Sequence, residues 1–187
     1  MLRGPRVRVE PIDARLAQAI VAGQPGPGRR WAEGFPMPAL VGIARRIAAA
    51  NEPLGPFLAY VIVLAADGSA IGDAGFHGPP DGEGELEIGY ALVPAARGAG
   101  LANEAVGLLI AWARRQPGVR TITARVDPGN AASERLLARL GFAADGERGA
   151  LRRFILPASA RRPPRPAPGT GRAGGPRART DPAGGGP

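Results

Sequence analysis

The chain has 187 residues and a hydrophobic fraction of 44%, which suits a single domain with a substantial core. It contains no cysteine and one histidine, which excludes disulfides, a thiol nucleophile and a cysteine or histidine metal cluster, so we expect no metal site. The net charge is +8, but residues 157–187 supply +5 of it, so the charge of the remaining chain does not by itself predict nucleic-acid binding.

Hydrophobic periodicity and turn residues predict mixed helices and strands along most of the chain. In chain order we expect a strand at 7–10, a helix at 11–22, a loop at 23–38, a helix at 39–51, strands at 57–65, 70–76 and 84–93, a helix at 98–116, a strand at 119–126, a helix at 130–140 and a hairpin over 142–156. No apolar run approaches the roughly 18 residues of a membrane span, and the first residues lack the apolar core of a signal peptide. We therefore expect a cytoplasmic protein that does not bind membranes.

Residues 158–187 differ in composition from the rest of the chain. They are rich in proline, glycine, alanine and arginine and hold few bulky apolar side chains. Such a segment cannot bury enough apolar surface to offset the entropy of ordering its backbone. We predict a folded domain at 1–157 and a disordered tail at 158–187. Contact of the arginine-rich tail with RNA or another acidic surface is an alternative to an inert extension.

The segment Arg97-Gly98-Ala99-Gly100-Leu101-Ala102 joins a predicted strand to a predicted helix. Its two glycines can take positive φ, and its small side chains leave the first N–H groups of the helix open to an anion. The alternative is a turn without a ligand. A P-loop is excluded because the chain has no lysine, and Asn103 stands where the third glycine of a dinucleotide-binding fingerprint would fall.

Two segments together resemble a known family. Residues 97–102 resemble the pyrophosphate loop of the GCN5-related N-acetyltransferases, Arg/Gln-x-x-Gly-x-Gly/Ala. The Asn-x-x-Ser at 130–133 and the Leu-Gly-Phe at 140–142 resemble the family's second signature, in the form seen in the branch that includes ribosomal-protein N-terminal acetyltransferases. The resemblance covers roughly residues 6 to 157. It implies an α/β (α+β) fold with a mixed sheet of six to seven strands, a V-shaped splay between the fourth and fifth strands and about four helices.

The resemblance also implies an activity and a set of binding residues. The activity is transfer of an acetyl group from acetyl-CoA to a primary amine, on a protein N-terminus or a small molecule. With no cysteine to form an acetyl-enzyme, the amine would attack directly in a ternary complex, in a monomer or homodimer. The implied coenzyme-binding residues are Leu92, Val93, Arg97, Gly98, Ala99, Gly100, Leu101, Ala102, Asn130 and Ser133. Asn130 also suits a helix N-cap.

Candidate catalytic residues follow from the same resemblance. Glu87 is the candidate base, acting directly or through a water, with Glu85 as the next choice; a solvated edge carboxylate is the alternative. The tyrosine that many members carry seven residues after the helix-start asparagine is Leu137 here. Ser133 is therefore the candidate donor to the leaving sulfur, although a cap or a coenzyme contact also explains it. The missing tyrosine leaves open a coenzyme A-binding module without turnover.

The amine acceptor is the least specified part of the prediction. Trp31 and Phe35 in the loop at 23–38, and His77 in the loop after 70–76, are candidate acceptor contacts; core packing or an exposed surface is the alternative for each. Deprotonating a lysine-type amine at neutral pH costs about 4 to 5 kcal/mol, whereas an α-amine costs only about 1 kcal/mol. A weak base therefore suffices for an N-terminal amine.

Overall fold

The structure, a computed structural model, describes residues 1–26, 28–50 and 54–158. The strands are β1 (Leu2–Arg3), β2 (Val7–Pro11), β3 (Arg30–Trp31), β4 (Ala59–Leu64), β5 (Ser69–Phe76), β6 (Glu85–Leu92), β7 (Thr121–Val126), β8 (Ala143–Arg148) and β9 (Leu151–Pro157). The helices are α1 (Ala14–Ala22), α2 (Pro38–Ala49), α3 (Leu101–Ala113) and α4 (Ala131–Arg139), with a 3-10 turn η1 (Pro94–Ala96). The tail predicted at 158–187 lies outside the described residues apart from Ala158.

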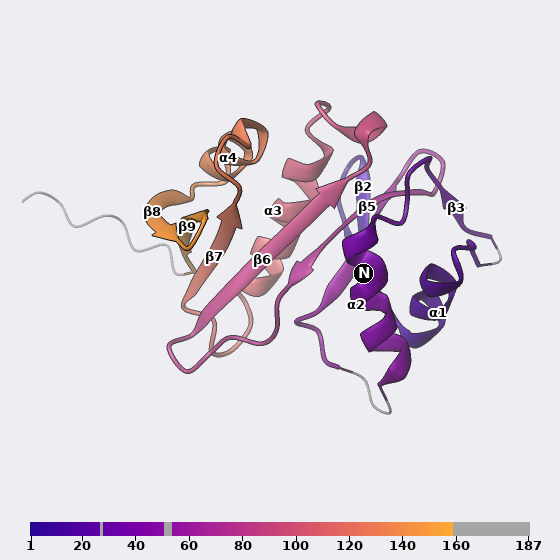
Figure 1. Cartoon of the computed structure of the whole chain (residues 1–187), viewed down its shortest axis with the longest axis horizontal. Helices are drawn as coiled ribbons and strands as arrows, with labels where there is room; N and C mark the ends of the chain where they lie inside the picture. The colour runs from indigo at the N-terminus through magenta and orange to yellow at the C-terminus, as the bar shows by residue number, and fades with distance from the viewer. Residues whose placement is uncertain (27, 51–53, 159–187) are drawn as a thin grey trace, which may run out of the picture.

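The strands form one mixed sheet, as predicted. Their order is β1-β2-β4-β5-β6-β7-β9-β8, with β3 added beside β5 (Figure 1). Neighbouring strands are antiparallel except for the parallel pairs β6–β7 and β3–β5. The sheet has nine strands where six or seven were predicted, because β1 and β3 each consist of two residues that become strand only by pairing with a neighbour.

The predicted splay is confirmed between β6 and β7, the fourth and fifth of the predicted strands. Their parallel register extends only from Glu85↔Thr121 to Glu87↔Thr123. Beyond this point β6 continues to pair with β5 as far as Gly72↔Leu92, while its other edge has no strand partner among the residues that the structure describes. The sheet therefore opens along the second half of β6, and the backbone groups of that edge are left for another partner.

The two faces of the sheet carry different helices. α1 and α2 pack against each other, while α3 lies behind β6 in Figure 1 and contacts β2, β5 and β6. The ring of Trp112 on α3 lies 5.7 Å from that of Phe76, whose register partner on β6 is Ile88. Because side chains alternate along a strand, Tyr90 shares the α3 face with Ile88, and Glu87 points to the opposite face.

Helix boundaries differ from prediction by up to three residues, including the end of α3 at Ala113 rather than at 116. α1 begins at Ala14 rather than at 11, because the Asp13 carboxylate accepts a hydrogen bond from the Leu16 N–H at 2.7 Å and caps the helix. α3 begins at Leu101 rather than at 98, since the preceding glycines have left-handed backbones. Within the described ranges, no helix is long and apolar enough to cross a membrane, and no group of three or more His, Asp or Glu side chains is arranged to hold a metal ion.

Candidate active site

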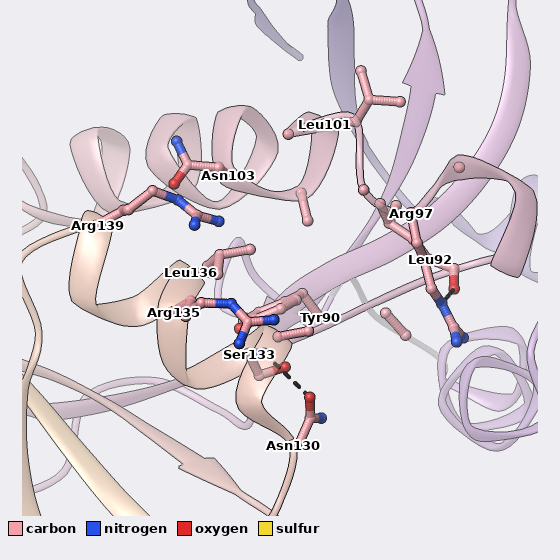
Figure 2. A pocket seen from close by; sticks show the side chains of 16 residues that line it. Tyr90, Leu92, Arg97, Leu101, Asn103, Asn130, Ser133, Arg135, Leu136 and Arg139 are labelled. Atoms are coloured by element: carbon pink, nitrogen blue, oxygen red, sulfur yellow. Dashed lines mark hydrogen bonds between the residues drawn. The ribbon is translucent and has the colours of Figure 1, made fainter.

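A cavity of about 490 Å³ lies between the C-terminal half of β6 and the first turns of α3 and α4 (Figure 2). The unpaired edge of β6 borders it. Eight of the predicted coenzyme-binding residues line it: Leu92, Arg97, Gly98, Gly100, Leu101, Ala102, Asn130 and Ser133. The fold thus brings the two sequence segments at 97–102 and 130–133 to one place.

The loop before α3 depends on glycine for its backbone conformation. Gly98 has φ 81° and Gly100 has φ 76°, both in the left-handed region. A Cβ at Gly98 would meet no atom within 4 Å, and one at Gly100 would meet only Arg6 Nη2 at 3.5 Å. Glycine is therefore required for its φ angle rather than for space. Gly100 is the N-cap of α3 and offers no side chain, so the first N–H groups of this helix face the cavity uncapped.

Arg6 and Glu104 hold this loop against α3. Arg6 Nη1 donates to the Ala99 carbonyl at 2.8 Å, and its Nε pairs with Glu104 Oε2 at 2.9 Å. Burial acts to raise the pKa of Glu104, but hydrogen bonds from Arg6 and Val7 outweigh it and lower that pKa overall. Ala99 itself does not line the cavity. Nothing in the sequence pattern indicated this clamp, because its two ends lie 98 residues apart.

The end of β6 has its backbone groups divided between two neighbours. The Val93 N–H donates to the Ile71 carbonyl at 2.9 Å, and Val93 does not line the cavity. The Leu92 carbonyl points the other way and accepts from Arg97 Nε at 3.0 Å. By alternation, the backbone groups of Tyr90 and the N–H of Leu92 face the splay.

The first turn of α4 forms the opposite wall. Asn130 Oδ1 accepts from the Ser133 N–H at 3.1 Å, which confirms the N-cap interpretation, and both residues border the cavity (Figure 2). The Ser133 hydroxyl is not used by this cap. It is therefore available to a ligand or to a neighbouring side chain.

The cavity lining is strongly basic. Arg97 from the loop and Arg135 and Arg139 from α4 contribute to it, and the described lining contains no Asp or Glu. Arg135 and Arg139 were not predicted. Their spacing of four residues places them on the same side of α4, and this spacing is the sequence signal that could have indicated a pair of basic side chains. Which side of α4 faces the cavity depends on how the helix packs against the rest of the domain.

Two buried polar atoms at the cavity lack a partner within the described part of the chain: Tyr90 Oη and Asn103 Oδ1. Burial raises the pKa of Tyr90, opposed by the nearby Ser133 hydroxyl and by the charge of Arg139. Leaving a buried polar group without a hydrogen bond costs folding free energy. Both atoms therefore suit a ligand that donates a hydrogen bond to Asn103 Oδ1 and forms another with the Tyr90 hydroxyl. Neither side chain was predicted.

Glu87 lies on the other face of β6, outside the cavity. Its carboxylate accepts from Arg125 at 2.8 and 2.7 Å, and His77 Nδ1 lies 3.1 Å from Oε1. This pairing with Glu87 raises the pKa of Arg125. The structure thus brings the predicted Glu87 and His77 together. Glu85, the alternative base, pairs instead with Arg153 at 2.5 Å.

The other two candidate acceptor residues lie elsewhere. The rings of Trp31 and Phe35 meet edge to face at 5.3 Å, and Phe35 is buried. Trp31 pairs with Ala70 near the start of β5, whereas His77 follows the end of that strand. Seven strand residues span about 23 Å, so these aromatic side chains and His77 do not form one cluster.

Comparisons with known proteins identify the family to which this chain is similar. A protein-family model described as an acetyltransferase (GNAT) domain matches residues 6–143. The uncharacterized N-acetyltransferase YjdG of Bacillus subtilis (strain 168) is 37% identical over 98 residues, which cover 52% of this chain and 58% of that protein. The match therefore spans little more than half of that relative's length.

Solved structures share the fold at low sequence identity. The ribosomal-protein-S5-alanine acetyltransferase from Vibrio fischeri has a TM-score of 0.64 at 19% identity, over 86% of this chain and 98% of that one. RimJ of Mycobacterium smegmatis, solved in complex with CoA-disulfide, has a TM-score of 0.56 at 23% identity, over 82% of this chain and 86% of that one.

Proposed function

The chain belongs to the GNAT family of acetyltransferases, and from this premise we propose that its cavity binds acetyl-CoA and that the protein transfers the acetyl group to a primary amine. The observation that carries the proposal is the uncapped start of α3, which meets three arginines in one cavity. Open N–H groups at a helix start, with the positive end of the helix dipole, favour a diphosphate. Arg135 and Arg139 add charge from the opposite wall.

The residues present fit the rest of the coenzyme. The pantetheine arm carries amides that suit the free backbone groups of Tyr90 and Leu92, in the manner of an added strand. The unpartnered Tyr90 Oη and Asn103 Oδ1 offer further polar contacts within the same cavity. The RimJ relative bound to CoA-disulfide gives independent support for coenzyme A as the ligand.

The proposed chemistry is direct attack of the amine on the thioester, since the chain has no cysteine to form an acetyl-enzyme. The coenzyme supplies the activated acetyl group. Glu87, beside the last β6–β7 pair, provides negative charge on the acceptor side of the splay. Ser133 stands on the coenzyme side with its hydroxyl outside the helix cap, and we assign it a contact with the sulfur end of the coenzyme.

A protein N-terminus is the acceptor we favour. The Vibrio fischeri relative is named for the alanine of ribosomal protein S5, and an α-amine needs only a weak base because its pKa lies near 8. Small amines are the alternative acceptors. Free-thiol release from acetyl-CoA, measured with alanine- and serine-initiated peptides, a polyamine and an aminoglycoside, tests the proposal, with mass spectrometry of each acceptor to confirm a gain of one acetyl group.

A second candidate is a module that binds coenzyme A without turnover. It is favoured by Leu137, which is fully buried where many family members carry a tyrosine. Acetyl-CoA binding without acceptor-dependent thiol release would support this module. Acceptor-dependent release with an acetylated product would exclude it, and an absence of both binding and release would contradict both candidates.

A further inference from the structure

We propose that His77 receives the proton of the acceptor amine and that Glu87 positions its imidazole. This assignment rests on the proposed acetyl transfer and adds a catalytic residue to it. It comes from the contacts around Glu87, His77 and Arg125, at the point where β6 leaves β7.

Glu87 is poorly placed to take a proton itself. Both of its oxygens accept a hydrogen bond from Arg125, at 2.8 and 2.7 Å, and Oε1 also faces His77 Nδ1 at 3.1 Å. A bidentate arginine contact of this kind is a strong, charge-assisted one. A proton arriving on Glu87 would neutralise the carboxylate that Arg125 binds and so weaken this charge-assisted contact, and the Glu87 side chain is only 21% exposed.

His77 offers a lone pair at a more exposed position than Glu87. An ionised carboxylate only accepts hydrogen bonds, so the 3.1 Å approach of Nδ1 to Glu87 Oε1 suits the tautomer that carries its proton on Nδ1 and its lone pair on Nε2. The His77 side chain is 58% exposed, so an acceptor can reach it. Its backbone is also fixed, because its N–H donates to the Glu87 carbonyl at 3.0 Å.

The free nitrogen lies over the start of the splay. A Cβ added to Gly89 would lie 3.1 Å from His77 Nε2, so this edge of the ring sits directly above the Gly89 backbone. Gly89 is two residues past Glu87, the last residue of β6 that pairs with β7. Glycine at 89 permits this close approach, because a side chain there would crowd the ring; the acceptor amine would reach Nε2 from the exposed side of the imidazole.

The charges around the imidazole suit a proton acceptor. The Glu87 carboxylate on β6 faces Nδ1, while Arg125 on β7 pairs with Glu87 rather than with the ring. His77 is thus the base, Glu87 the carboxylate that orients it, and Arg125 the group that holds Glu87. In other active sites a base oriented by a further group likewise activates an amine or a hydroxyl.

The step balances as follows. The acceptor ammonium gives one proton to Nε2, and its nitrogen lone pair forms the new C–N bond with the acetyl carbon. The C–S bond breaks, and sulfur leaves with the bonding pair as a thiolate. The second proton on nitrogen goes to the thiolate, which yields amide and free thiol. The imidazolium returns its proton to solvent through its exposed edge.

The test compares His77→Ala and His77→Asn in steady-state assays with acetyl-CoA and an alanine-initiated peptide. Asparagine can keep the donor to Glu87 but has no base at the position of Nε2. We expect both variants to lose about 100-fold in kcat, with KM for acetyl-CoA unchanged, and we expect added imidazole to restore at least tenfold to the alanine variant. A Glu10→Gln variant is the control, because Glu10 is also paired with two arginines, Arg8 and Arg29, far from the splay.

Several results would overturn the assignment. One is a kcat of His77→Ala within threefold of the parent. Another is a parental rate in His77→Asn, which would mean that His77 only holds Glu87 in place. The third is failure of added imidazole to restore any rate to His77→Ala. If the proposed function itself were wrong, the unsubstituted protein would show no acceptor-dependent turnover, which distinguishes that failure from the outcomes above. Calorimetric titration with acetyl-CoA shows whether each variant still binds the coenzyme. Thermal unfolding confirms that each variant is folded.

Discussion

Replacing Asp73 by asparagine should stabilise the folded protein in a way that depends on pH. Asp73 lies within β5, in register with Val61 on β4 and Ala91 on β6. Burial is the cause that acts on its carboxyl, and it raises the pKa of Asp73 from 3.8 to about 7. A charge in this position is desolvated on folding, which disfavours the folded state whenever the carboxyl is ionised.

The size of the effect follows from the two pKa values. They differ by about 3 units, each worth about 1.4 kcal/mol. Below pH about 4 the carboxyl is neutral in both states, so it contributes no penalty. Between pH 4 and 7 the unfolded chain releases the proton and the folded chain keeps it, so the free energy of unfolding falls. Above pH 7 the full penalty of about 4 kcal/mol remains. Asparagine cannot ionise and avoids this loss.

Urea unfolding of the parent and Asp73→Asn at pH 5 and pH 8 measures the effect. The advantage of the variant should grow by about 2 to 3 kcal/mol between these two values. Asp67→Asn is a control with the opposite sign, because hydrogen bonds from Ser69 lower the pKa of Asp67. Losing the Asp67 carboxylate should therefore lower the free energy of unfolding at neutral pH, and this difference from the parent should disappear on acidification. A difference for Asp73→Asn that stays constant with pH would refute this reasoning.

Two further predictions concern the cavity. Arg139→Gln should weaken acetyl-CoA binding about tenfold, measured by calorimetry, and reduce the salt dependence of that binding. Arg45→Gln, on the exposed surface of α2, should change neither the affinity nor its salt dependence. Equal effects of the two substitutions would exclude a phosphate contact by Arg139. Tyr90→Phe removes an unpartnered buried hydroxyl, so it should raise the free energy of unfolding without ligand by about 1 kcal/mol while weakening acetyl-CoA binding. Tyr60→Phe, which loses a 2.6 Å hydrogen bond to the Pro56 carbonyl, should lower stability by about 1 kcal/mol and leave binding unchanged; the same sign in both tyrosine variants would contradict this account.

The sequence predicted the parts of the fold that have a local signal. The alternation along 84–93 and the helical period after Leu101 define β6 and α3, and the glycines at 98 and 100 mark the loop between them. The two-residue strands β1 and β3 carry no such period. They form because a longer neighbour offers an edge, which is a tertiary effect that a short segment does not encode.

The same limit explains what was missed at the site. The Tyr90 side chain was not among the predicted site residues, because its place in the cavity depends on how α4 packs beside the splay. The partners of Glu87 come from two other segments, and Arg125 can reach it because Thr123, two residues earlier on β7, is the register partner of Glu87. Contacts of this kind depend on strand register and helix docking, which residue spacing within one segment does not determine.

Calorimetric titration of acetyl-CoA into the parent protein, Gly100→Val and Gly23→Val tests the central claim most directly. Both glycines have positive φ, 76° at Gly100 and 69° at Gly23, so valine strains both backbones in the same way, but Gly23 ends α1 away from the cavity. The account predicts saturable binding to the parent, similar affinity for Gly23→Val and at least a tenfold loss for Gly100→Val. No heat of binding with the parent protein, or equal affinity in all three proteins, would contradict it.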